Sequence, residues 1–447
     1  MVGGSMAGLL AARVLSDHFG RVTIIERDRF SEGPAPRRGV PQAHQLHVLL
    51  KRGKVILERH FPGLGEELIF AGAPVVDMAN DLAWLTPAGW GTRFPSELVL
   101  IAFSRDLLDF SVRRRLAARG SVRFLEEHDV AGLLPGAGGV AGVRVRSRTS
   151  EEMRADLVVD AAGRGSRAPR WLEEVGYAPP EETAIDAHLG YASRLYGRPP
   201  NFRAGWQGVY VQVAPPDFTH GGVLFPIEGD RWMVTLVGGD RNYPPTDVAG
   251  FADFARSLRT PAIHEALEGA EPLTPVRRYR ATENRRRHYE RLSRMPDNFL
   301  ITGDAACTFN PVYGQGMTTA ALGAEALEAC LLERGVAKGG VLTGLSKRFQ
   351  GKLAKVNAAP WILATGEDYR YRGTEGGTPD RTTRFMHRYM DRGDGSLHDG
   401  RRRAPAPAER VQPHRAAHHP LPPLPCRDGA AAGGLPPAQS HSASGRA

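Results

Sequence analysis

The chain has 447 residues, of which 41% are hydrophobic and 24% are charged, and its formal net charge is +9. A chain of this length and apolar content can bury a large core and form two domains. The basic residues come without an arginine–aromatic recognition module, so we expect no nucleic-acid binding, and no apolar run is long enough for a membrane span. The cysteines lack metal or redox spacing, which is typical of free thiols in a reducing cytoplasm. They are Cys307, Cys330 and Cys426.

The first recognisable element is a glycine-rich turn of the G-x-G-x-x-G type, with serine in place of the middle glycine. Its small residues let a diphosphate approach the backbone, and the last glycine permits close packing of a helix on a strand. The segment 22–26 is typical of a buried strand that ends in an acid for an adenosine ribose. Such turns also occur by chance, so this turn indicates a dinucleotide site only together with a second binding element elsewhere in the chain. The residues expected to bind a dinucleotide here are Gly3, Gly4, Ser5, Met6, Ala7, Gly8, Glu26 and Arg27.

Only Met1 and Val2 precede this turn, whereas the first strand of a dinucleotide-binding fold has about five or six residues. Without that strand, the neighbouring strands would carry unpaired backbone groups inside the sheet. We therefore expect the recorded start to lie downstream of the true one. The intact mass of the natural protein tests this expectation.

The next segments predict a loop and helix, then short strands, then a second helix. The first of these helices is expected to contain His44 and His47, which would share a helix face as metal ligands sometimes do. No acidic or cysteine ligand lies nearby, so we expect no metal. Between 71 and 101, apolar runs broken by proline and glycine predict strands of a second sheet. Ser104 then caps a helix with an apolar side.

The middle of the chain is rich in predicted strands. The stretches 122–125 and 140–145 predict two of them, and 155–163 predicts a buried strand that returns to the first sheet. From about 185 to 282, β-branched and aromatic residues predict a strand-rich second domain. Ordinary sheet packing explains any single aromatic residue better than a binding site does, but as a set they favour a pocket for a bulky hydrophobic substrate. The set is Tyr191, Trp206, Tyr210, Phe225 and Trp232.

The most informative segment is 300–317. Residues 300–302 are typical of a short buried strand, and the acid after it can bind the hydroxyls of a ribityl chain. The glycines that follow let the backbone approach a ligand, and a helix N-terminus there offers N–H groups to the pyrimidine edge of a flavin. The alternative is a plain turn before a surface helix, but the N-terminal glycine turn favours a flavin site. The residues expected there are Gly303, Asp304, Pro311, Gly314, Gly316 and Met317.

Two other stretches near the C-terminal half have distinct compositions. Residues 284–288 are highly basic and are expected to form a solvated strand end, and the chain from Leu322 to about 390 is expected to be mainly helical. From 393 onward the chain is rich in Pro, Ala, Gly, His and Arg without periodicity, and it cannot bury a core. We expect 393–447 to be a disordered or out-of-frame ending rather than a basic tail for an acidic partner.

Four groups of residues form recognisable motifs: 38–42 with His44 and His47, 93–95 with 104–108, 284–289, and 309–314. Together they resemble FAD-dependent monooxygenases of the para-hydroxybenzoate hydroxylase fold, and more closely their squalene-epoxidase-like and polyether-epoxidase relatives. The resemblance covers residues 1 to about 390. It implies an α/β fold with a Rossmann-type, glutathione reductase-like FAD-binding domain, a mostly antiparallel β-sheet substrate domain and C-terminal helices. The implied bounds are 1–70, 104–180 and 283–345 for a discontinuous FAD-binding domain, 71–103 and 181–282 for the substrate domain, and 346–392 for a helical segment.

The resemblance also implies further contacts with FAD. It places Arg105 at the pyrophosphate, a role that suits the bidentate guanidinium, although a solvated first-turn arginine is the alternative. It places Arg38 and Gln42 near the flavin ring or ribityl chain, although the same stretch also fits an exposed loop. Val130 is a further expected cofactor contact.

The activity that the resemblance implies is that of a flavin monooxygenase. Reduced FAD and dioxygen would form a C4a-hydroperoxide, which passes its distal oxygen to an electron-rich alkene or ring. The protein would hold the flavin, exclude water and position the substrate, so no catalytic side chain is assigned. Epoxidation of a hydrophobic polyketide or terpenoid is expected first, aromatic hydroxylation is the alternative, and reduction of a prenyl double bond comes third. A halogenase is disfavoured because Trp-x-Trp-x-Ile-Pro is absent, and a catalytically inactive flavin-binding remnant stays open.

One departure from the family leaves the electron source open. Flavin hydroxylases of this fold often carry an Asp-Gly pair at the end of the strand 155–163, where this chain has Ala162 and Gly163, with Asp160 two residues earlier. Because that motif is tied to nicotinamide use, the electrons are expected from NAD(P)H or from a separate flavin reductase. The remaining candidates for this role are Arg164, Ser166 and Arg167.

Overall fold

The computed structural model describes residues 1–147 and 149–389. The predictions for 393–447 and for Cys426 therefore lie outside the described residues. The labelled α-helices are α1 (Met6–Leu15), α2 (Lys51–His60), α3 (Leu64–Phe70), α4 (Arg105–Ala117), α5 (Ala168–Glu174), α6 (Val248–Arg256), α7 (Ala262–Leu267), α8 (Gly316–Glu333) and α9 (Leu345–Asp368), and residues 381–389 are also helical.

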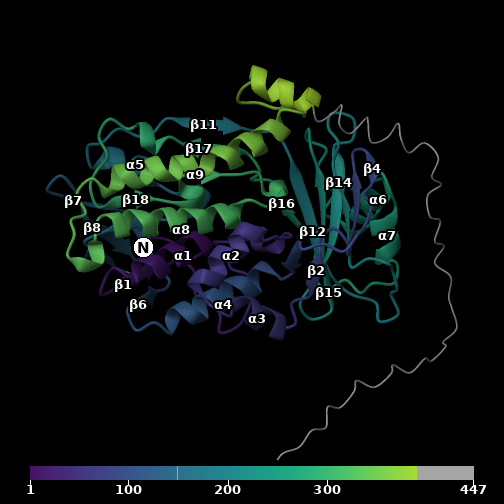
Figure 1. Ribbon diagram of the computed structural model, residues 1–447, viewed down its shortest axis with the longest axis horizontal. Helices are drawn as coiled ribbons and strands as arrows, with labels where there is room; N and C mark the ends of the chain where they lie inside the picture. The colour runs from purple at the N-terminus through teal and green to yellow at the C-terminus, as the bar shows by residue number, and fades with distance from the viewer. Residues whose placement is uncertain (148, 390–447) are drawn as a thin grey trace, which may run out of the picture. The chain divides into compact units, whose positions relative to one another are not determined.

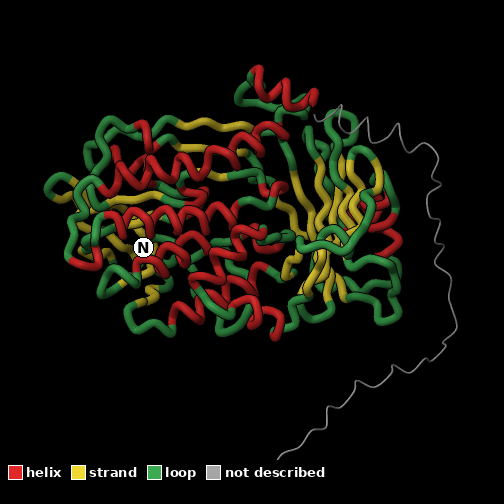
Figure 2. The backbone as a smooth tube through the Cα atoms, in the orientation of Figure 1, coloured by secondary structure: helices red, strands yellow, loops and turns green. Residues whose placement is uncertain are grey.

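The strands form a parallel sheet, a large mostly antiparallel sheet and several small sheets (Figures 1 and 2). The parallel sheet contains β1 (Val22–Ile25), β6 (Val122–Leu125), β10 (Val158–Asp160) and β18 (Phe299–Ile301). The large sheet contains β3 (Leu82–Thr86), β4 (Gly89–Trp90), β12 (Gly190–Gly197), β13 (Gly208–Val211), β14 (His220–Ile227), β15 (Arg231–Gly238) and β16 (Arg277–Tyr279). The small sheets pair β2 (Val75–Asp77) with β5 (Val99–Ile101), β7 (Asp129–Gly136) and β9 (Ser150–Arg154) with β8 (Gly139–Arg146), and β11 (Glu182–Ile185) and β19 (Cys307–Thr308) with β17 (Asn284–Arg287).

Val2 joins the two halves of the parallel sheet. It forms parallel bridges to Ile25 of β1 and to Asp160 of β10, so the order across the sheet is β6, β1, Val2, β10 and β18. The N–H of Val2 donates to the carbonyl oxygen of Val159 at 2.8 Å, and the N–H of Gly3 donates to that of Ile25 at 2.9 Å. Two residues thus supply the central backbone pairing from which the glycine turn emerges.

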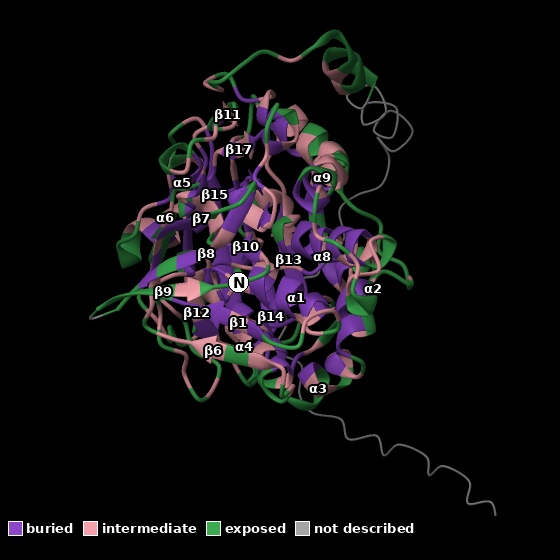
Figure 3. Ribbon diagram, turned by 90° about the vertical axis from the view of Figure 1, so that its left-hand side faces the viewer, coloured by how far each residue is buried: buried purple, intermediate pink, exposed green. Residues whose placement is uncertain are grey.

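The core of this half of the molecule lies between the parallel sheet and helices α1, α2, α8 and α9. Helix α1 packs along α8, which in turn contacts α2 and α9. Leu9 and Leu10 of α1 and Ile24 of β1 are fully buried, as are Leu331 of α8 and Phe349 of α9. Figure 3 shows this buried zone around α1, α8, β1 and β10. None of the helices in residues 1–147 and 149–389 is both long and apolar enough to cross a bilayer.

The large sheet has two different faces, because side chains alternate along each strand. On β15, Trp232, Val234 and Leu236 pack against Phe251 of α6 and Ile263 of α7. These two helices cover the side of the sheet that faces away from α1 and α8 (Figure 1). Sequence analysis predicted the strands of this region but missed α6 and α7, which are short.

Two other sequence predictions are wrong in this part of the fold. Pro41–His44 forms a single 3-10 turn and α2 begins only at Lys51, so His44 and His47 do not share a helix face. The basic stretch is no solvated strand end, because β17 is the central strand between β11 and β19 and its Asn284 is fully buried. Its arginines are balanced by carboxylates, and Arg287 pairs with Glu182 at 3.0 Å.

The predicted cap of α4 is confirmed. The Oγ of Ser104 accepts the N–H of Leu107 at 3.2 Å. We expect Ser104→Ala to lower the free energy of unfolding by about 1 kcal/mol, because a helix N–H loses its acceptor. Urea denaturation monitored by circular dichroism measures the change. Ser257→Ala, at the exposed C-terminal end of α6, is the control and should stay within about 0.5 kcal/mol of the parent. Equal losses in both variants would contradict the capping role.

Candidate functional site

The two glycine-bearing loops that the sequence predicts as a pair line one cavity of about 550 Å³. One is the turn at the start of α1, and the other runs from the end of β18 to the start of α8. The volume falls in the range of about 300–1,000 Å³ that is typical of small-molecule and cofactor sites. The predicted residues that line it are Gly3, Gly4, Ser5, Met6, Ala7, Glu26, Arg27, Gln42, Arg105, Val130, Gly303, Asp304, Pro311, Gly314, Gly316 and Met317.

The turn before α1 is shaped by glycines that tolerate no side chain. Gly3 has a φ of +91°, and a Cβ there would lie 2.6 Å from the carbonyl oxygen of Ala161. The N–H of Gly4 donates to Glu26 Oε2 at 2.7 Å, which ties the turn to the end of β1. The N-terminus of α1 thus faces the cavity with its first N–H groups, an arrangement that suits a diphosphate.

Two predicted residues, Gly8 and Arg38, do not line the cavity. Gly8 is a packing residue, because a Cβ there would lie 1.9 Å from the carbonyl oxygen of Gly3. Arg38 is exposed, whereas the preceding Arg37 turns inward: it lies 3.4 Å from Glu26 and donates to the carbonyl oxygen of Gly4 at 3.1 Å. Neither arginine lines the cavity, and Arg37 contacts the α1 turn from outside it.

Arg105 stands beside the α1 turn. Its side chain is buried, with Nε donating to Asp109 at 2.7 Å and a terminal nitrogen donating to the Oγ of Ser5 at 2.8 Å. These contacts hold the guanidinium at the cavity wall, beside the N–H groups of the turn. A fixed cation in this place favours an anionic ligand.

Asp304 lies at the opposite loop, directly after β18. No hydrogen bond from the described residues reaches its carboxylate, and burial raises its pKa, which Arg164 and Arg105 oppose. Gly303 has a φ of +59° and brings the loop against Ala7, since a Cβ there would lie 2.5 Å from that of Ala7. An acceptor without a donor, at the wall of a cavity, is suited to the hydroxyls of a ligand.

Helix α8 begins at the same wall. Gly316 and Met317 line the cavity, and a Cβ added at Gly316 would meet no atom within 4 Å. The N-termini of α1 and α8 therefore open into one space, and each contributes free N–H groups and the positive end of a helix dipole.

Sequence analysis did not assign one wall of the cavity to the site. Leu46, His47 and Val48 lie between Pro41–His44 and α2, and belong to a stretch that the sequence analysis assigned to a helix. Their backbone docks on the large sheet, where the N–H of Leu46 donates to Thr235 Oγ1 at 3.2 Å. No local pattern predicts this docking. Other wall residues that were not assigned include Gln45, His128, Asp129, Trp171, Tyr279, Ala281, Thr308 and Phe309.

His47 is the imidazole of this wall. Its Nδ1 lies 2.9 Å from the carbonyl oxygen of Gln45, so that nitrogen carries the proton. Burial lowers the pKa of His47 to about 3, and the charge of Arg105 adds to the decrease. The ring is therefore neutral at ordinary pH and is a weak base.

Two of the three residues proposed for nicotinamide use line the cavity. Arg164 and Arg167 are these two residues. The hydroxyl of Ser166 instead donates to the buried Asp160 at the end of β10. Arg164 donates to Glu283 at 3.2 Å, and Arg167 donates to Asp129 at 2.7 Å. Both guanidinium groups are thus paired within the protein.

The predicted aromatic pocket is wrong as a set. Trp232 and Trp206 both pack around Phe202 in the layer between the sheet and helices α6 and α7. Tyr191, Tyr210 and Phe225 face the other side of the sheet. None of the five lines the cavity. Strand alternation divides the set between two faces, which their enrichment alone does not reveal.

These features fit FAD. Glu26 and Asp304 are two carboxylates of the cavity lining that suit the hydroxyls of a ribose and a ribityl chain, and two helix N-termini suit a diphosphate and an electron-rich ring edge. Glycine at the turn removes the side chains that would block close approach of a ligand to the backbone.

Residues 1–343 match the family model described as an FAD binding domain, and the chain belongs to this family. The α/β fold class predicted from the sequence is confirmed. Fold and family together define an FAD-binding protein. Protein Rv3254 of Mycobacterium tuberculosis (strain ATCC 25618 / H37Rv) is 35% identical over 385 residues, which are 81% of this chain and 78% of that protein.

Solved structures with a similar fold include both monooxygenases and halogenases. PqsL of Pseudomonas aeruginosa, a probable FAD-dependent monooxygenase, is 18% identical with a TM-score of 0.61, covering 82% of this chain and 94% of that one. The myxobacterial chondrochloren halogenase CndH is 18% identical with a TM-score of 0.62, covering 90% and 89%. The flavin-dependent brominase Bmp2 is 16% identical with a TM-score of 0.62, covering 81% and 84%. At these identities the similarity concerns the fold.

Proposed function

We propose that this protein is a flavin-dependent monooxygenase that epoxidises an alkene of a hydrophobic polyketide or terpenoid substrate. The observation that carries the proposal is the convergence of the α1 turn and the β18–α8 loop on one cavity with an apolar wall at Leu46, Val48 and Phe309. The sequence resemblance to squalene-epoxidase-like and polyether epoxidases supports the choice of substrate class.

The proposed cofactor contacts follow from the cavity lining. The turn from Gly3 to Ala7 and Arg105 would hold the diphosphate, Glu26 the adenosine ribose, and Asp304 the ribityl hydroxyls. FAD, when bound and reduced, supplies the electrons that activate dioxygen for transfer of one oxygen atom. We further propose that segments 1–70, 104–180 and 283–345 bind this cofactor, and that 71–103 and 181–282 face the substrate.

Two titratable groups of the cavity lining, His47 and Tyr279, favour epoxidation over hydroxylation of a phenol. Oxidation of an alkene removes no proton from the substrate, whereas a phenol is activated by loss of its proton to a base. His47 has a pKa of about 3 and is a poor proton acceptor, and burial raises the pKa of Tyr279. Neither His47 nor Tyr279 is therefore an efficient base for a phenol.

The apolar side chains of the same wall have a second role in the proposal. Leu46, Val48, Ala281 and Phe309 would exclude water from the reacting oxygen and would pack against a hydrocarbon. The electrons would come from NAD(P)H or from a separate flavin reductase, since Ala162 stands where a family aspartate is usual. The buried free thiols of Cys307 and Cys330 fit a reducing compartment such as the cytoplasm.

The test is an oxygenation assay on the purified, FAD-loaded protein. NADPH, NADH or a separate flavin reductase is supplied, and oxygen uptake is followed with a panel of hydrophobic polyenes and a panel of phenols. We expect oxygen-dependent addition of one oxygen atom to a polyene, with the product identified as an epoxide by its acid-catalysed opening to a diol.

Other outcomes lead to defined alternatives. Oxygenation of phenols alone would favour an aromatic hydroxylase, and a halide-dependent product would favour a halogenase. Hydrogen peroxide as the sole product with every panel member and reductant would favour an inactive flavin-binding remnant. Each of these results contradicts the proposed epoxidation.

A further inference from the structure

A buried polar cluster lies behind the loop that lines the flavin cavity. It consists of Asp368 at the end of α9, Asn284 of β17, Tyr191 of β12, and Asn310 and Tyr313 of the loop. Asp368 and Asn284 are fully buried, and Asn310 is 1% exposed. Nothing in the proposed chemistry requires a carboxylate in this place.

The cluster alternates with the cavity lining along the loop. Pro311 and Gly314 line the cavity, whereas the side chains of Asn310 and Tyr313 contact Asp368 on the other side. The Oδ1 of Asp368 accepts from the hydroxyl of Tyr313 at 2.7 Å and from the Nδ2 of Asn310 at 3.1 Å. Asp368 thus holds the loop from behind at two points.

Backbone donors fix the direction of the hydrogen bonds in the cluster. The backbone N–H of Asn310 donates to the Oδ1 of Asn284 at 2.8 Å, so the Nδ2 of Asn284 must point to Asp368, where it lies 2.6 Å from Oδ2. The N–H of Val312 and the hydroxyl of Tyr191 both donate to the Oδ1 of Asn310, which turns its Nδ2 to Asp368. Both oxygens of residue 368 must therefore be acceptors, a requirement that an ionised carboxylate meets.

We propose that Asp368 is a positioning residue of the flavin site, whose ionised carboxylate holds Asn310 and Tyr313 and thereby fixes the loop that lines the cavity. The inference rests on the proposed placement of the flavin against this loop. Through the bond from Tyr191 to Asn310, the same contact ties the loop to β12 of the substrate sheet.

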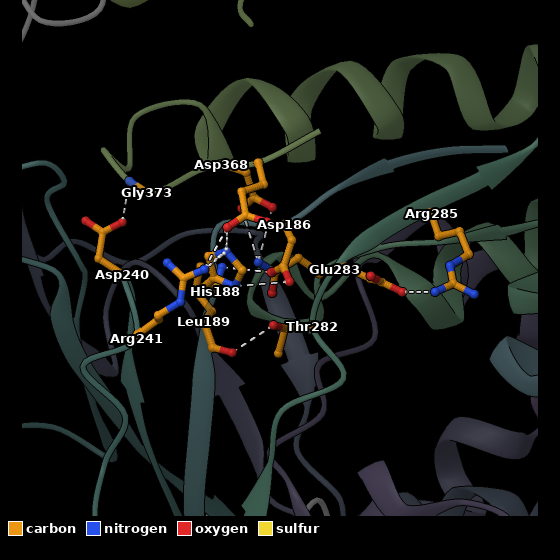
Figure 4. Close-up of polar contacts among 12 residues, drawn as sticks. Asp186, His188, Leu189, Asp240, Arg241, Thr282, Glu283, Arg285, Asp368 and Gly373 are labelled. Carbon is orange, nitrogen blue, oxygen red and sulfur yellow. Dashed lines mark hydrogen bonds and ion pairs between the residues drawn. The ribbon is translucent and has the colours of Figure 1, made fainter. Parts of the chain in front are cut away.

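Other hydrogen bonds hold the segments around Asp368 independently of its carboxylate. The N–H of Gly373 donates to Asp240 at 2.9 Å, and the hydroxyl of Thr282 donates to the carbonyl oxygen of Leu189 at 2.8 Å (Figure 4). The backbones of Asp186 and Glu375 exchange two hydrogen bonds, at 3.1 and 2.9 Å. The fold of the segments around Asp368 should therefore survive the loss of the charge on this residue.

The charge on Asp368 is sensitive to pH near neutrality. Burial raises its pKa to about 7, the neighbouring carboxylates of Asp186 and Glu367 add to the increase, and hydrogen bonds from Tyr313 and Asn310 oppose it. The other ionisable groups that face it are the phenols of Tyr191, Tyr313, Tyr369 and Tyr371, whose pKa values burial raises. As pH falls through about 7, Asp368 takes up a proton, and one of its carboxylate oxygens becomes a hydrogen-bond donor. The contacts of Asp368 with Asn310 and Tyr313 then weaken.

The test measures FAD affinity by quenching of flavin fluorescence between about pH 5.5 and about pH 8.5. In the parent protein, affinity should fall as pH falls, with a midpoint near pH 7. In Asp368→Asn, the new amide nitrogen opposes a donor of the cluster, so affinity at the basic end should fall by about tenfold and the step near pH 7 should vanish.

The matched control is Glu375→Gln, which also removes one negative charge from this segment. The Glu375 carboxylate is exposed and contacts His188 and Arg241 instead of the loop, so this variant should keep the parent affinity and the parent pH profile. A flat loss at every pH in both variants would assign the effect to net charge and overturn the inference.

A milder variant, Tyr313→Phe, removes one donor from the carboxylate and keeps the ring. Its midpoint should move to higher pH, because the ionised form of Asp368 loses a stabilising hydrogen bond. An unchanged midpoint would overturn the inference even if Asp368→Asn fails to fold. The readout is FAD binding. A protein whose FAD affinity depends on Asp368 as predicted, but which oxidises no alkene, would therefore contradict the proposed function and leave this inference in place.

Discussion

Replacing Asp304 by alanine should weaken FAD binding by about 100-fold, since two hydrogen bonds from sugar-alcohol hydroxyls to an ionised carboxylate contribute about 1.5 kcal/mol each. The carboxylate receives no hydrogen bond from the described residues, and burial raises its pKa. In the apoprotein the buried carboxyl group therefore has no hydrogen-bond partner among the described residues, and the thermal midpoint should stay the same or rise when this group is removed. Fluorescence titration with FAD and thermal unfolding of the apoprotein measure the two effects.

The control for this substitution is Asp304→Asn, which keeps the shape of the side chain and one acceptor oxygen. Its loss of FAD affinity should lie between that of the parent and that of Asp304→Ala. An alanine variant that retains the parent content of FAD would remove Asp304 from the site, and a variant that unfolds at lower temperature would assign it a structural role instead.

Gly8→Ala should damage both the fold and the site. The added Cβ would lie 1.9 Å from the carbonyl oxygen of Gly3, and neither atom belongs to a flexible side chain that could move away. Either α1 or the turn must shift, at a cost of about 3 kcal/mol in the free energy of unfolding. FAD affinity should fall with it, because the turn that lines the cavity is displaced. Urea denaturation of the apoprotein and FAD titration measure both losses.

Two glycine-to-alanine controls separate the causes. Gly20→Ala meets no atom within 4 Å and lies outside the cavity, so both stability and FAD affinity should stay at parent values. Gly316→Ala also meets no protein atom, but its Cβ would enter the space where the ring edge of FAD is proposed to lie. That variant should lose FAD affinity at unchanged or slightly increased apoprotein stability. Full FAD affinity in Gly316→Ala would move the cofactor away from the start of α8.

The sequence predicted those parts of the site that depend on local geometry. Glycine at tight turns, an acid directly after a buried strand and a small-residue helix start are all local requirements. They correctly brought Gly3, Glu26 and Asp304 to one cavity. The Ser104 cap is local in the same sense, since the acceptor and the N–H that it binds are three residues apart.

The remainder depends on contacts that no short window contains. Whether Arg37 or Arg38 faces the turn is decided by Glu26 and Asp28, which lie on another segment. His47 lies on an extended stretch because the backbone of Leu46 docks on Thr235, far along the chain. Periodicity within the stretch suggested a helix, and tertiary contact overrode it.

On the proposal that 181–282 face the substrate, the alternation of faces along β15 has a practical consequence for changing substrate selectivity. Trp232, Val234 and Leu236 pack against α6 and α7. Thr235 and Val237 lie on the opposite face of the sheet, which the backbone of Leu46 contacts. A mutant library that varies every second codon of this strand would therefore reshape only the inner surface. Directed evolution confined to those positions would leave the outer helical layer undisturbed.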